Sequence, residues 1–412
     1  MKVFKFGGAS VKDAEGVKNV ARVLKNQGFE QCMLVVSAMG KTTNALEIVV
    51  ENYFAKGDYK AQTTQIKQAH IDVAKGLFPE GHTIYGDIEE FFYDIESFLR
   101  RNKSPNYNFV YDQVVSCGEM ISSRILSEYL VQEKLINTWL DARDYIKTDV
   151  GYREGEVDWK LTEENVKQLN TKYSFVTQGF IGSDANNFTV TLGREGSDYS
   201  AAIFAYCLDA EQMTIWKDVP GVMTGDPRKF DQVELLADIS YEEAIEMAYY
   251  GASVIHPKTL QPLKQKSIPF FVKSFIEDDK PGTKVSEDIN YPRKESYILK
   301  ENQTFMTIET RDFSFIAEDH MSFIFGLLSK FKIKVSLIQN TAISLALCLE
   351  DKFKNSGRLN EILSEKFKTH LVPDVALFTV RNANMNDVEK FYENKNVLME
   401  QLAVNTLQMV TK

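Results

Sequence analysis

Thr191-Leu-Gly-Arg-Glu-Gly-Ser-Asp198 is a polar loop with two glycines that leads directly into the apolar segment 199–208, for which we predict a helix. A loop that opens a helix gathers free backbone N–H groups at the positive end of the helix dipole, which suits an anion. Arg194 adds a planar donor that fits a carboxylate or a phosphate. Ser197 and Asp198 are suited either to capping the helix or to facing a ligand. From the loop alone two interpretations remain open: an anion-binding site, or a capped helix start with a solvated arginine.

The N-terminus carries a second strand end that is rich in glycine. Residues 3–6 form a short apolar strand that Gly7-Gly8 interrupts, and an amphipathic helix is predicted over residues 14–27. Lys5 would lie near the end of this strand as a point charge, where the glycines let the backbone approach a phosphate. The glycine pair has neither the Walker spacing nor the dinucleotide fingerprint, so by itself it is weak evidence for a nucleotide site.

Three further polar clusters follow predicted strands or helices. Ser37–Thr43 follows the strand 33–36, residues 216–228 follow the strand 213–216, and residues 255–258 follow a helix near 240–250. Open α/β sheets bind ligands beyond the carboxyl ends of their strands. The clusters therefore favour a ligand site at one edge of a parallel sheet.

These clusters together resemble the aspartokinase family over residues 1–290, in order and at similar spacing. The resemblance implies an α/β fold with a mostly parallel sheet sandwiched by helices, the amino-acid kinase fold, followed by a ferredoxin-like ACT regulatory region. The motifs that carry it are Lys5-Phe-Gly-Gly-Ala-Ser-Val11, Val35-Val-Ser-Ala-Met-Gly-Lys-Thr-Thr-Asn44, Ser116-Cys-Gly-Glu119, Gln178-Gly-Phe-Ile-Gly182, Thr191-Leu-Gly-Arg-Glu-Gly-Ser-Asp198, Asp218-Val-Pro-Gly221, Asp226-Pro-Arg228 and His256-Pro-Lys258.

The resemblance also implies an activity: transfer of the γ-phosphoryl group of ATP to the β-carboxylate of L-aspartate, the first step towards lysine, threonine and methionine. It implies ATP and Mg²⁺ as cofactors, without a metal site built by protein side chains. The residues that match the family's functional positions fall into three groups. They are the catalytic Lys5 and Asp198; the substrate-binding Ser37, Thr43, Glu119, Arg194 and Ser197; and the nucleotide-binding Gly7, Gly8, Ser10, Lys217, Asp218, Asp226, Arg228 and Lys258.

Some roles stay open at this point. Glu119 would hold the α-ammonium group of the substrate, or serve only as a carboxylate favoured by a helix N-terminus. Asp198 would cap a helix, or organise lysines and Mg²⁺ around the phosphates. Two positions depart from the family pattern, because Ala9 and Lys217 stand where threonine is usual. The loss of a hydroxyl at Ala9 and the extra cation at Lys217 leave the nucleotide preference open.

Composition limits the classes of protein. The 412 residues are 44% hydrophobic, which is enough for two or three domains, and the net charge of −10 argues against a nucleic-acid partner. The four cysteines include no CxxC pair, so core thiols in a reducing, cytoplasmic setting are expected rather than disulfides. We expect no signal peptide and no membrane span, and the length leaves no room for an attached dehydrogenase.

The predicted domains are an amino-acid kinase domain over 1–285, an ACT-like domain over 300–380 and a partial second ACT-like unit over 381–412. Residues 54–105 are expected to form a helical insertion and 277–293 a linker. After the linker, the order βαββαβ is typical of a ferredoxin-like unit. The last 32 residues hold about half a unit, with a short helix near 386–392, so the second unit is either reduced or borrows strands from the first.

The C-terminal region also predicts partners and regulation. We expect a homodimer or a dimer of dimers through the ACT-like region, because ferredoxin-like sheets leave edges that pair with a second copy. Lysine-sensitive relatives carry carboxylates where this chain has Ser336 and Thr341-Ala342, so weak inhibition by lysine is expected. The alternative functions are a glutamate or N-acetylglutamate kinase, or an inactive amino-acid sensor. Carbamate and UMP fit Glu119 and Arg194 poorly, because they lack an amino-acid head group.

Overall fold

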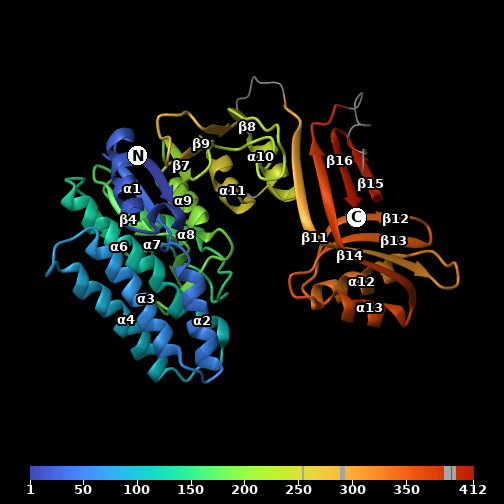
Figure 1. The fold of residues 1–412 in the computed structure, drawn as a ribbon, viewed down its shortest axis with the longest axis horizontal. Coiled ribbons are helices and arrows are strands. Elements are labelled where there is room, and N and C mark those ends of the chain that lie inside the picture. The colour runs from blue at the N-terminus through green and yellow to red at the C-terminus, as the bar shows by residue number, and fades with distance from the viewer. Residues whose placement is uncertain (253–254, 288–292, 385–390, 392–395) are drawn as a thin grey trace. The chain divides into compact units, whose positions relative to one another are not determined.

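The computed structural model describes residues 1–252, 255–287, 293–384, 391 and 396–412. They group into two compact units (Figure 1). The first unit comprises Met1–Val222, Leu235–Ile245 and a segment that begins at Ile255. The second comprises Met223–Glu234, a segment that begins at Glu246, and the C-terminal part of the chain. Residues 223–234 therefore group with the second unit, although they lie within the range 1–285 predicted for the kinase domain.

An eight-stranded sheet forms the centre of the first unit. Its neighbouring strands are parallel except for one antiparallel pair, β9 with β10, which confirms the mostly parallel sheet. In spatial order the strands are β3 (Thr138–Leu140), β4 (Phe175–Gln178), β2 (Cys32–Val36), β1 (Lys2–Phe6), β7 (Gln212–Lys217), β9 (Phe270–Ser274), β10 (Thr283–Ser286) and β8 (Asp238–Ser240).

Helices cover both faces of this sheet (Figure 1). The helices that lie wholly in the first unit are α1 (Ala14–Gln27), α2 (Thr42–Phe54), α3 (Tyr59–Lys75), α4 (Ile84–Arg101), α5 (Tyr107–Val115), α6 (Cys117–Gln132), α7 (Ala142–Tyr145), α8 (Trp159–Val166), α9 (Gly196–Cys207) and α11 (Pro257–Gln265), with the short 3₁₀ helix η1 (Gly8–Val11). Among them, α3 and α4 pack on α2 and α6 and on each other. The helix α10 (Tyr241–Tyr250) has residues in both units. A two-stranded sheet, β5 (Ile181–Ser183) with β6 (Thr189–Thr191), lies between β4 and α9 in the chain.

The alternation of side chains along β1 decides which face carries chemistry. Phe4 and Phe6 point to the face covered by α1 and α6, where both rings contact Trp216 of β7. Because successive residues of a strand point to opposite faces, Lys5 points to the other face, which α9 covers. The buried apolar strand β1 thus places the ammonium group of Lys5 on the side of the sheet that α9 covers.

Part of the predicted linker is wrong. Residues 283–286 form strand β10, which pairs antiparallel with β9 and parallel with β8. Gly282 has φ +72°, and a Cβ there would lie 2.2 Å from the carbonyl oxygen of Val272. This glycine lets the chain turn back against β9, so the segment joins the sheet instead of leaving it.

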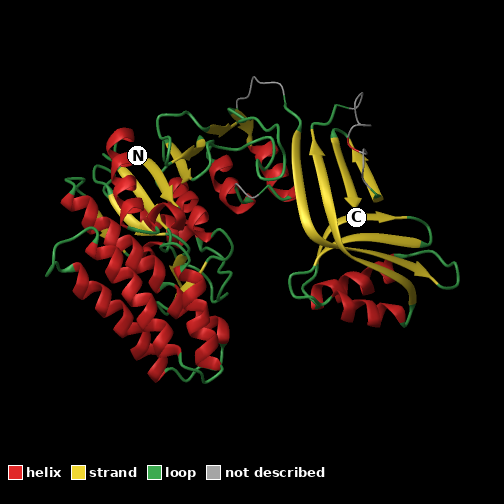
Figure 2. Ribbon diagram, viewed as in Figure 1, coloured by secondary structure: helices red, strands yellow, loops and turns green. Residues whose placement is uncertain are grey.

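The second unit has the predicted order βαββαβ, followed by two more strands. Its elements are β11 (Ser296–Thr310), α12 (Glu318–Lys330), β12 (Lys334–Asn340), β13 (Ser344–Glu350), α13 (Ser356–Ser364), β14 (Phe367–Arg381), β15 (Val397–Ala403) and β16 (Thr406–Thr411). They form one antiparallel sheet in the order β12-β13-β11-β14-β16-β15. Figure 2 shows both helices beside one part of this sheet, where they share a core with β11 and β13.

The two 15-residue strands explain how the last residues fold. The beginning of β11 pairs with the end of β14, and that end of β14 pairs with β16. The C-terminal strands therefore borrow β11 and β14 from the first half, which was one of the two predicted options. The predicted helix near 386–392 falls outside the described residues, apart from residue 391.

The described helices include none that is both long enough and apolar enough to span a lipid bilayer.

Candidate functional site

Three loops meet at the carboxyl ends of the central strands. The N–H of Ser37, after β2, donates to the carbonyl oxygen of Phe6 over 3.1 Å. The N–H of Gly40 donates to the carbonyl oxygen of Gly8 over 3.0 Å. The N–H of Gly179, after β4, donates to the carbonyl oxygen of Val36 over 2.8 Å. The loops that follow β1, β2 and β4 are therefore fixed to one another at one edge of the sheet, where open α/β folds bind ligands.

Two glycines make this close approach possible. A Cβ at Gly8 would lie 2.6 Å from the carbonyl oxygen of Ala38, and a Cβ at Gly179 would lie 2.4 Å from the Cβ of Ser197. The second contact brings the start of α9 against the loop after β4. Both glycines are required here by space, because any side chain would collide with a neighbouring loop.

A buried ion pair lies where these loops meet. Lys5 Nζ is 2.5 Å from Asp198 Oδ1, and their side chains are 10% and 4% exposed. Lys217 Nζ, at the end of β7, is 3.9 Å from Asp198 Oδ2. Burying charges is expensive even when they are paired, so such a pair is weak evidence for stability. This pair lies at the carboxyl ends of the strands, where open α/β sheets bind ligands, so it is a candidate part of a ligand site.

The structure decides between the two interpretations of the start of α9. The helix begins at Gly196, its N-cap residue is Glu195, and no side chain caps it. Ser197 and Asp198 therefore lie inside the first turn, and the interpretation of Asp198 as the helix cap is wrong. The physical reason is that the helix begins at Gly196, three residues before the start at residue 199 that the apolar pattern indicated.

Glu195 is a candidate that sequence reasoning missed. Its φ of +54° is in the left-handed region, which is uncommon for a residue with a side chain. Its Oε2 is buried without a hydrogen-bond partner in the described part of the chain. Burial, and then the charge of Asp198, raises the pKa of its carboxyl group. Its place between Arg194 and Gly196 was the only signal that could have identified it.

Glu119 lies in the first turn of α6 and is almost fully buried, with 2% of its surface exposed. Thr43 Oγ1 donates to its Oε1 over 3.5 Å, and its Oε2 has no partner among the described residues. Burial raises the pKa of this carboxyl group to about 8. A buried carboxyl group with one open oxygen is suited to an ammonium group. Ser122, one turn later, donates to the carbonyl oxygen of Ser37 over 2.7 Å, which joins α6 to the loop after β2.

Arg194 lies in the exposed turn that leads into α9. The preceding Gly193 has φ +80°, so the chain turns sharply just before the arginine. Within the described chain, no hydrogen bond or ion pair engages its guanidinium group. Its donors are thus available to a ligand.

The predicted nucleotide-binding residues do not all gather in one place. Ser10 is buried beside the glycine pair in η1, and its hydroxyl has no partner among the described residues. Lys217 lies at the ion pair, and Asp218 follows it, exposed, at the end of β7. Lys258 is exposed in the first turn of α11, where the side chain of His256 accepts from its N–H.

Asp226 and Arg228 belong to the second unit, where they pair with each other over 2.7 Å. Their segment is held by Phe230, whose ring packs on Tyr297 and Phe378. Sequence reasoning placed this motif in the kinase domain because the residues around it match that domain. Residues 223–234 belong to the second unit because they pack against segments that are distant in sequence, and a local sequence pattern does not show such packing.

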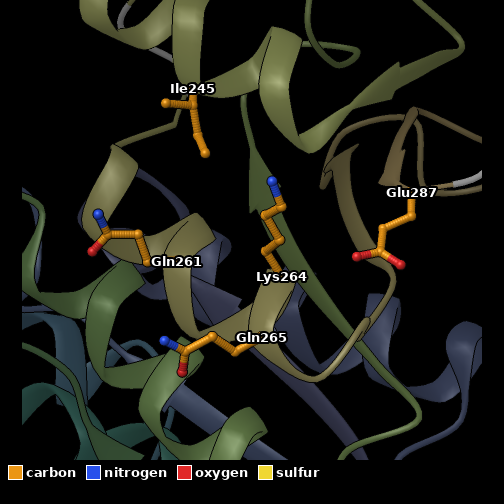
Figure 3. A pocket seen from close by; sticks show the side chains of 5 residues that line it. All are labelled: Ile245, Gln261, Lys264, Gln265 and Glu287. Carbon is orange, nitrogen blue, oxygen red and sulfur yellow. The ribbon is translucent and has the colours of Figure 1, made fainter.

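A separate hollow of about 570 Å³ lies between α10, α11 and the end of β10. Figure 3 shows the polar side chains of Gln261, Lys264 and Glu287 around it. None of the predicted site residues lines it, so it does not contribute to the site at the strand ends. The four cysteines are free, and three of them are buried, as expected for core thiols.

The comparisons with known proteins agree on one family. The model of the Amino acid kinase family matches residues 1–274. Lysine-sensitive aspartokinase 3 of Escherichia coli (strain K12) is 32% identical over 358 residues, which is 84% of this chain and 78% of that protein. The chloroplastic bifunctional aspartokinase/homoserine dehydrogenase 2 of Arabidopsis thaliana is 29% identical over 90% of this chain, which spans only 42% of that relative.

Solved structures are similar over the whole chain. Escherichia coli aspartokinase III in complex with lysine and aspartate, in its T-state, has a TM-score of 0.85 and 27% identity, covering 100% of this chain and 95% of that one. The same enzyme in complex with aspartate and ADP, in its R-state, has a TM-score of 0.81 and 27% identity, covering 100% and 96%.

Proposed function

Because this chain belongs to the amino acid kinase family, and within it to the aspartokinases, we propose that it transfers the γ-phosphoryl group of ATP to the β-carboxylate of L-aspartate. The product is 4-phospho-L-aspartate, which starts the pathway to lysine, threonine and methionine. One observation carries the proposal: the buried ion pair of Lys5 with Asp198 and the open carboxyl group of Glu119 occur in the same unit. The first suits a transferring phosphoryl group, and the second suits an amino acid.

The reaction needs little covalent help from the protein. A carboxylate oxygen of aspartate forms the new bond to the γ-phosphorus, while the bond from that phosphorus to the bridging oxygen of ADP breaks. Because the attacking oxygen is already ionised, no strong general base is required. Two anions must be brought together while charge redistributes on the transferring group, so catalysis is positioning and electrostatic stabilisation.

Lys5 is the residue we assign to that stabilisation. Asp198 holds its ammonium group at 2.5 Å, and a Cβ at Gly7 would come within 3.5 Å of Lys5 Nζ. The absence of a side chain at Gly7 therefore leaves the ammonium group accessible from the glycine loop. Lys217 adds a second cation on the same carboxylate, where the family usually has threonine. We assign Asp198 the role of fixing both lysines at the phosphates.

The substrate is held at its two ends by different elements. Glu119 would accept the α-ammonium group, with Thr43 on the other oxygen of the carboxyl group. Arg194 would bind the α-carboxylate in a bidentate manner, because its guanidinium group is exposed at the start of α9. Ser37, in the loop after β2, and Ser197, in the first turn of α9, would add hydroxyl donors.

We further propose that ATP is used as its Mg²⁺ complex. No group of three or more His, Cys, Asp or Glu side chains gathers in the parts of the chain that are described. Mg²⁺ needs no such group, because it keeps several waters and binds through phosphates and one or two carboxylates. Asp198 and Glu195 would be its neighbours, since both carboxylates lie in the field of Lys5 and Lys217. The ion would offset the negative charge of the phosphates.

The proposal is tested by ATP-dependent hydroxamate formation, in which hydroxylamine traps the acyl phosphate. Aspartate, glutamate, N-acetylglutamate and no acceptor are compared at equal concentration. We expect hydroxamate with aspartate alone. A higher rate with glutamate or N-acetylglutamate would indicate another amino acid kinase, and no hydroxamate with any acceptor would indicate a sensor without kinase activity.

We propose that the chain assembles as a homodimer or a dimer of dimers in the cytoplasm. The strands β12 and β15 are the two edges of the second sheet, and an edge strand presents unpaired N–H and C=O groups to a partner. The free cysteines are consistent with a reducing compartment. Sedimentation of the full chain as a monomer at micromolar concentration would count against the assembly.

A further inference from the structure

Two side chains at the end of α5 hold strand β6, which leads into the Arg194 loop. Asp112 is fully buried, and its Oδ2 accepts from the N–H of Thr191 over 2.9 Å. Its Oδ1 accepts from Thr191 Oγ1 over 2.8 Å. The neighbouring Gln113 donates to the carbonyl oxygen of Thr189 over 2.8 Å and accepts from the N–H of the same residue over 3.1 Å. The two side chains thus bond to β6 as a further strand would.

The same carboxylate also holds a second loop. Asp112 Oδ2 accepts from the N–H of Arg153 over 3.0 Å, and Arg153 has φ +75°. A Cβ at Gly193 would lie 3.3 Å from the carbonyl oxygen of Arg153, so this loop packs directly against the turn before Arg194. The guanidinium group of Arg153 lies 4.0 Å above the ring of Tyr111 and 2.9 Å from Glu47. Asp112 therefore fixes β6 and the loop that supports it.

The helix that carries these two residues also leads to Glu119. Ser116 is both the C-cap residue of α5 and the N-cap residue of α6, so the two helices share one junction. Glu119 follows three residues later in the first turn of α6. Arg194 follows Thr191 by three residues on the other side. The segment 112–119 therefore connects the two groups that we assign to the two ends of aspartate.

We propose that Asp112 and Gln113 are positioning residues that set the spacing between Glu119 and Arg194, and thereby the affinity for aspartate. This inference rests on the proposed function, because it assigns those two groups to the substrate. A bidentate guanidinium contact depends on geometry, and a displacement of about 1 Å costs up to about a hundredfold in rate or affinity. A buried carboxylate with three donors holds that geometry without touching the substrate.

The alternative is that Asp112 only stabilises the hairpin of β5 and β6, and the chain offers a matched control for it. Asp184 is 1% exposed and lies at the other end of the same hairpin. It accepts from the N–H groups of Asn186 and Phe188 and from the hydroxyl of Tyr152. It also holds three donors, but it is remote in sequence from the Arg194 turn. A general loss of hairpin stability would affect both sites alike.

The experiment measures KM for aspartate, KM for ATP and kcat in the full chain and four variants. We expect Asp112→Ala to raise KM for aspartate by about tenfold to a hundredfold with KM for ATP unchanged. Asp112→Asn should restore KM, because its amide oxygen can accept from both backbone N–H groups while its NH₂ donates to Thr191 Oγ1. Asp184→Ala should leave KM for aspartate within about twofold, since it does not touch the Arg194 turn.

Gln113→Met keeps the length of the side chain but removes both bonds to Thr189, and it should raise KM for aspartate by a smaller factor. It decides the question if Asp112→Ala does not fold, because an unchanged KM in Gln113→Met would then overturn the proposal. The proposal is also overturned if Asp112→Ala raises both KM values equally, or if Asp184→Ala raises KM for aspartate as much. The unmodified chain is assayed first, so that a failure of the proposed function, with no aspartate-dependent hydroxamate, is distinguished from a failure of this inference.

Discussion

The carboxyl group of Glu119 makes aspartate binding depend on pH. Burial raises its pKa to about 8, and its open Oε2 is the atom that we assign to the substrate ammonium group. At neutral pH, before substrate binds, most of the protein therefore carries Glu119 protonated. An ammonium group requires the ionised form, so binding must release the proton. The affinity for aspartate should improve as pH rises towards 8.

The size of the effect follows from the fraction of ionised Glu119. With a pKa of about 8, roughly one molecule in eleven is ionised at about pH 7, and the apparent dissociation constant rises by the inverse of that fraction. This corresponds to about 1.4 kcal/mol, since one pKa unit is about 1.36 kcal/mol. Between about pH 6.5 and pH 8.5, KM for aspartate should fall by about twentyfold to thirtyfold.

The assay is aspartate-dependent hydroxamate formation across that pH range, with KM for ATP as an internal control. Glu119→Gln should bind aspartate weakly and show no such slope, because its amide does not titrate. The Glu119→Gln variant should fold. Because the pKa of Glu119 is raised in the folded state, ionisation of Glu119 lowers the free energy of unfolding as pH rises from the ordinary pKa of a glutamate through about 8. The substitution should therefore not lower Tm near pH 8. Calorimetry in two buffers should show release of about 0.9 proton per aspartate bound at about pH 7. A KM for aspartate that stays constant over this range, with kcat still measurable, would refute the assignment of Glu119.

Three further outcomes are expected. Lys5→Ala should fold but lose about 10²–10³-fold or more in kcat, because the cation on Asp198 is removed where charge develops; near-normal turnover would exclude Lys5 from catalysis. Arg194→Lys should raise KM for aspartate and leave KM for ATP unchanged, since a point charge does not replace a planar donor; an effect on ATP alone would move Arg194 to the nucleotide. Lysine titrated at sub-saturating aspartate should inhibit weakly, because Ser336, whose hydroxyl donates to Gln303, and Ala342 stand where lysine-sensitive relatives carry carboxylates; half-inhibition below about 1 mM, a binding free energy near −4 kcal/mol, would show this to be wrong.

The order of the elements and the types of the reactive residues could be predicted from the sequence. Short apolar runs predicted the central strands within about one residue, because burial on both sides of a parallel sheet imposes a continuous apolar run. Glycines at strand ends predicted where the chain must pass close to itself, as at Gly8 and Gly179. Lys5 stood out at a glycine-rich strand end and Asp198 at a junction between a loop and a helix, whereas Glu119 was identified through the resemblance of its motif to the aspartokinases.

Which of these residues meet depends on the three-dimensional fold. Asp198 pairs with Lys5, which is nearly 200 positions away in the sequence, and with Lys217, which is 19 positions away. The register of β1 with β7 and the position of the start of α9 bring these three residues together. The sequence around Asp112 indicates only a helix residue, and its three hydrogen-bond donors are visible only in the structure. The left-handed backbone of Glu195 is likewise not predictable from its sequence. Local patterns report burial and backbone preference along one segment, whereas hydrogen bonds and charge pairs across segments depend on a register that the whole core sets.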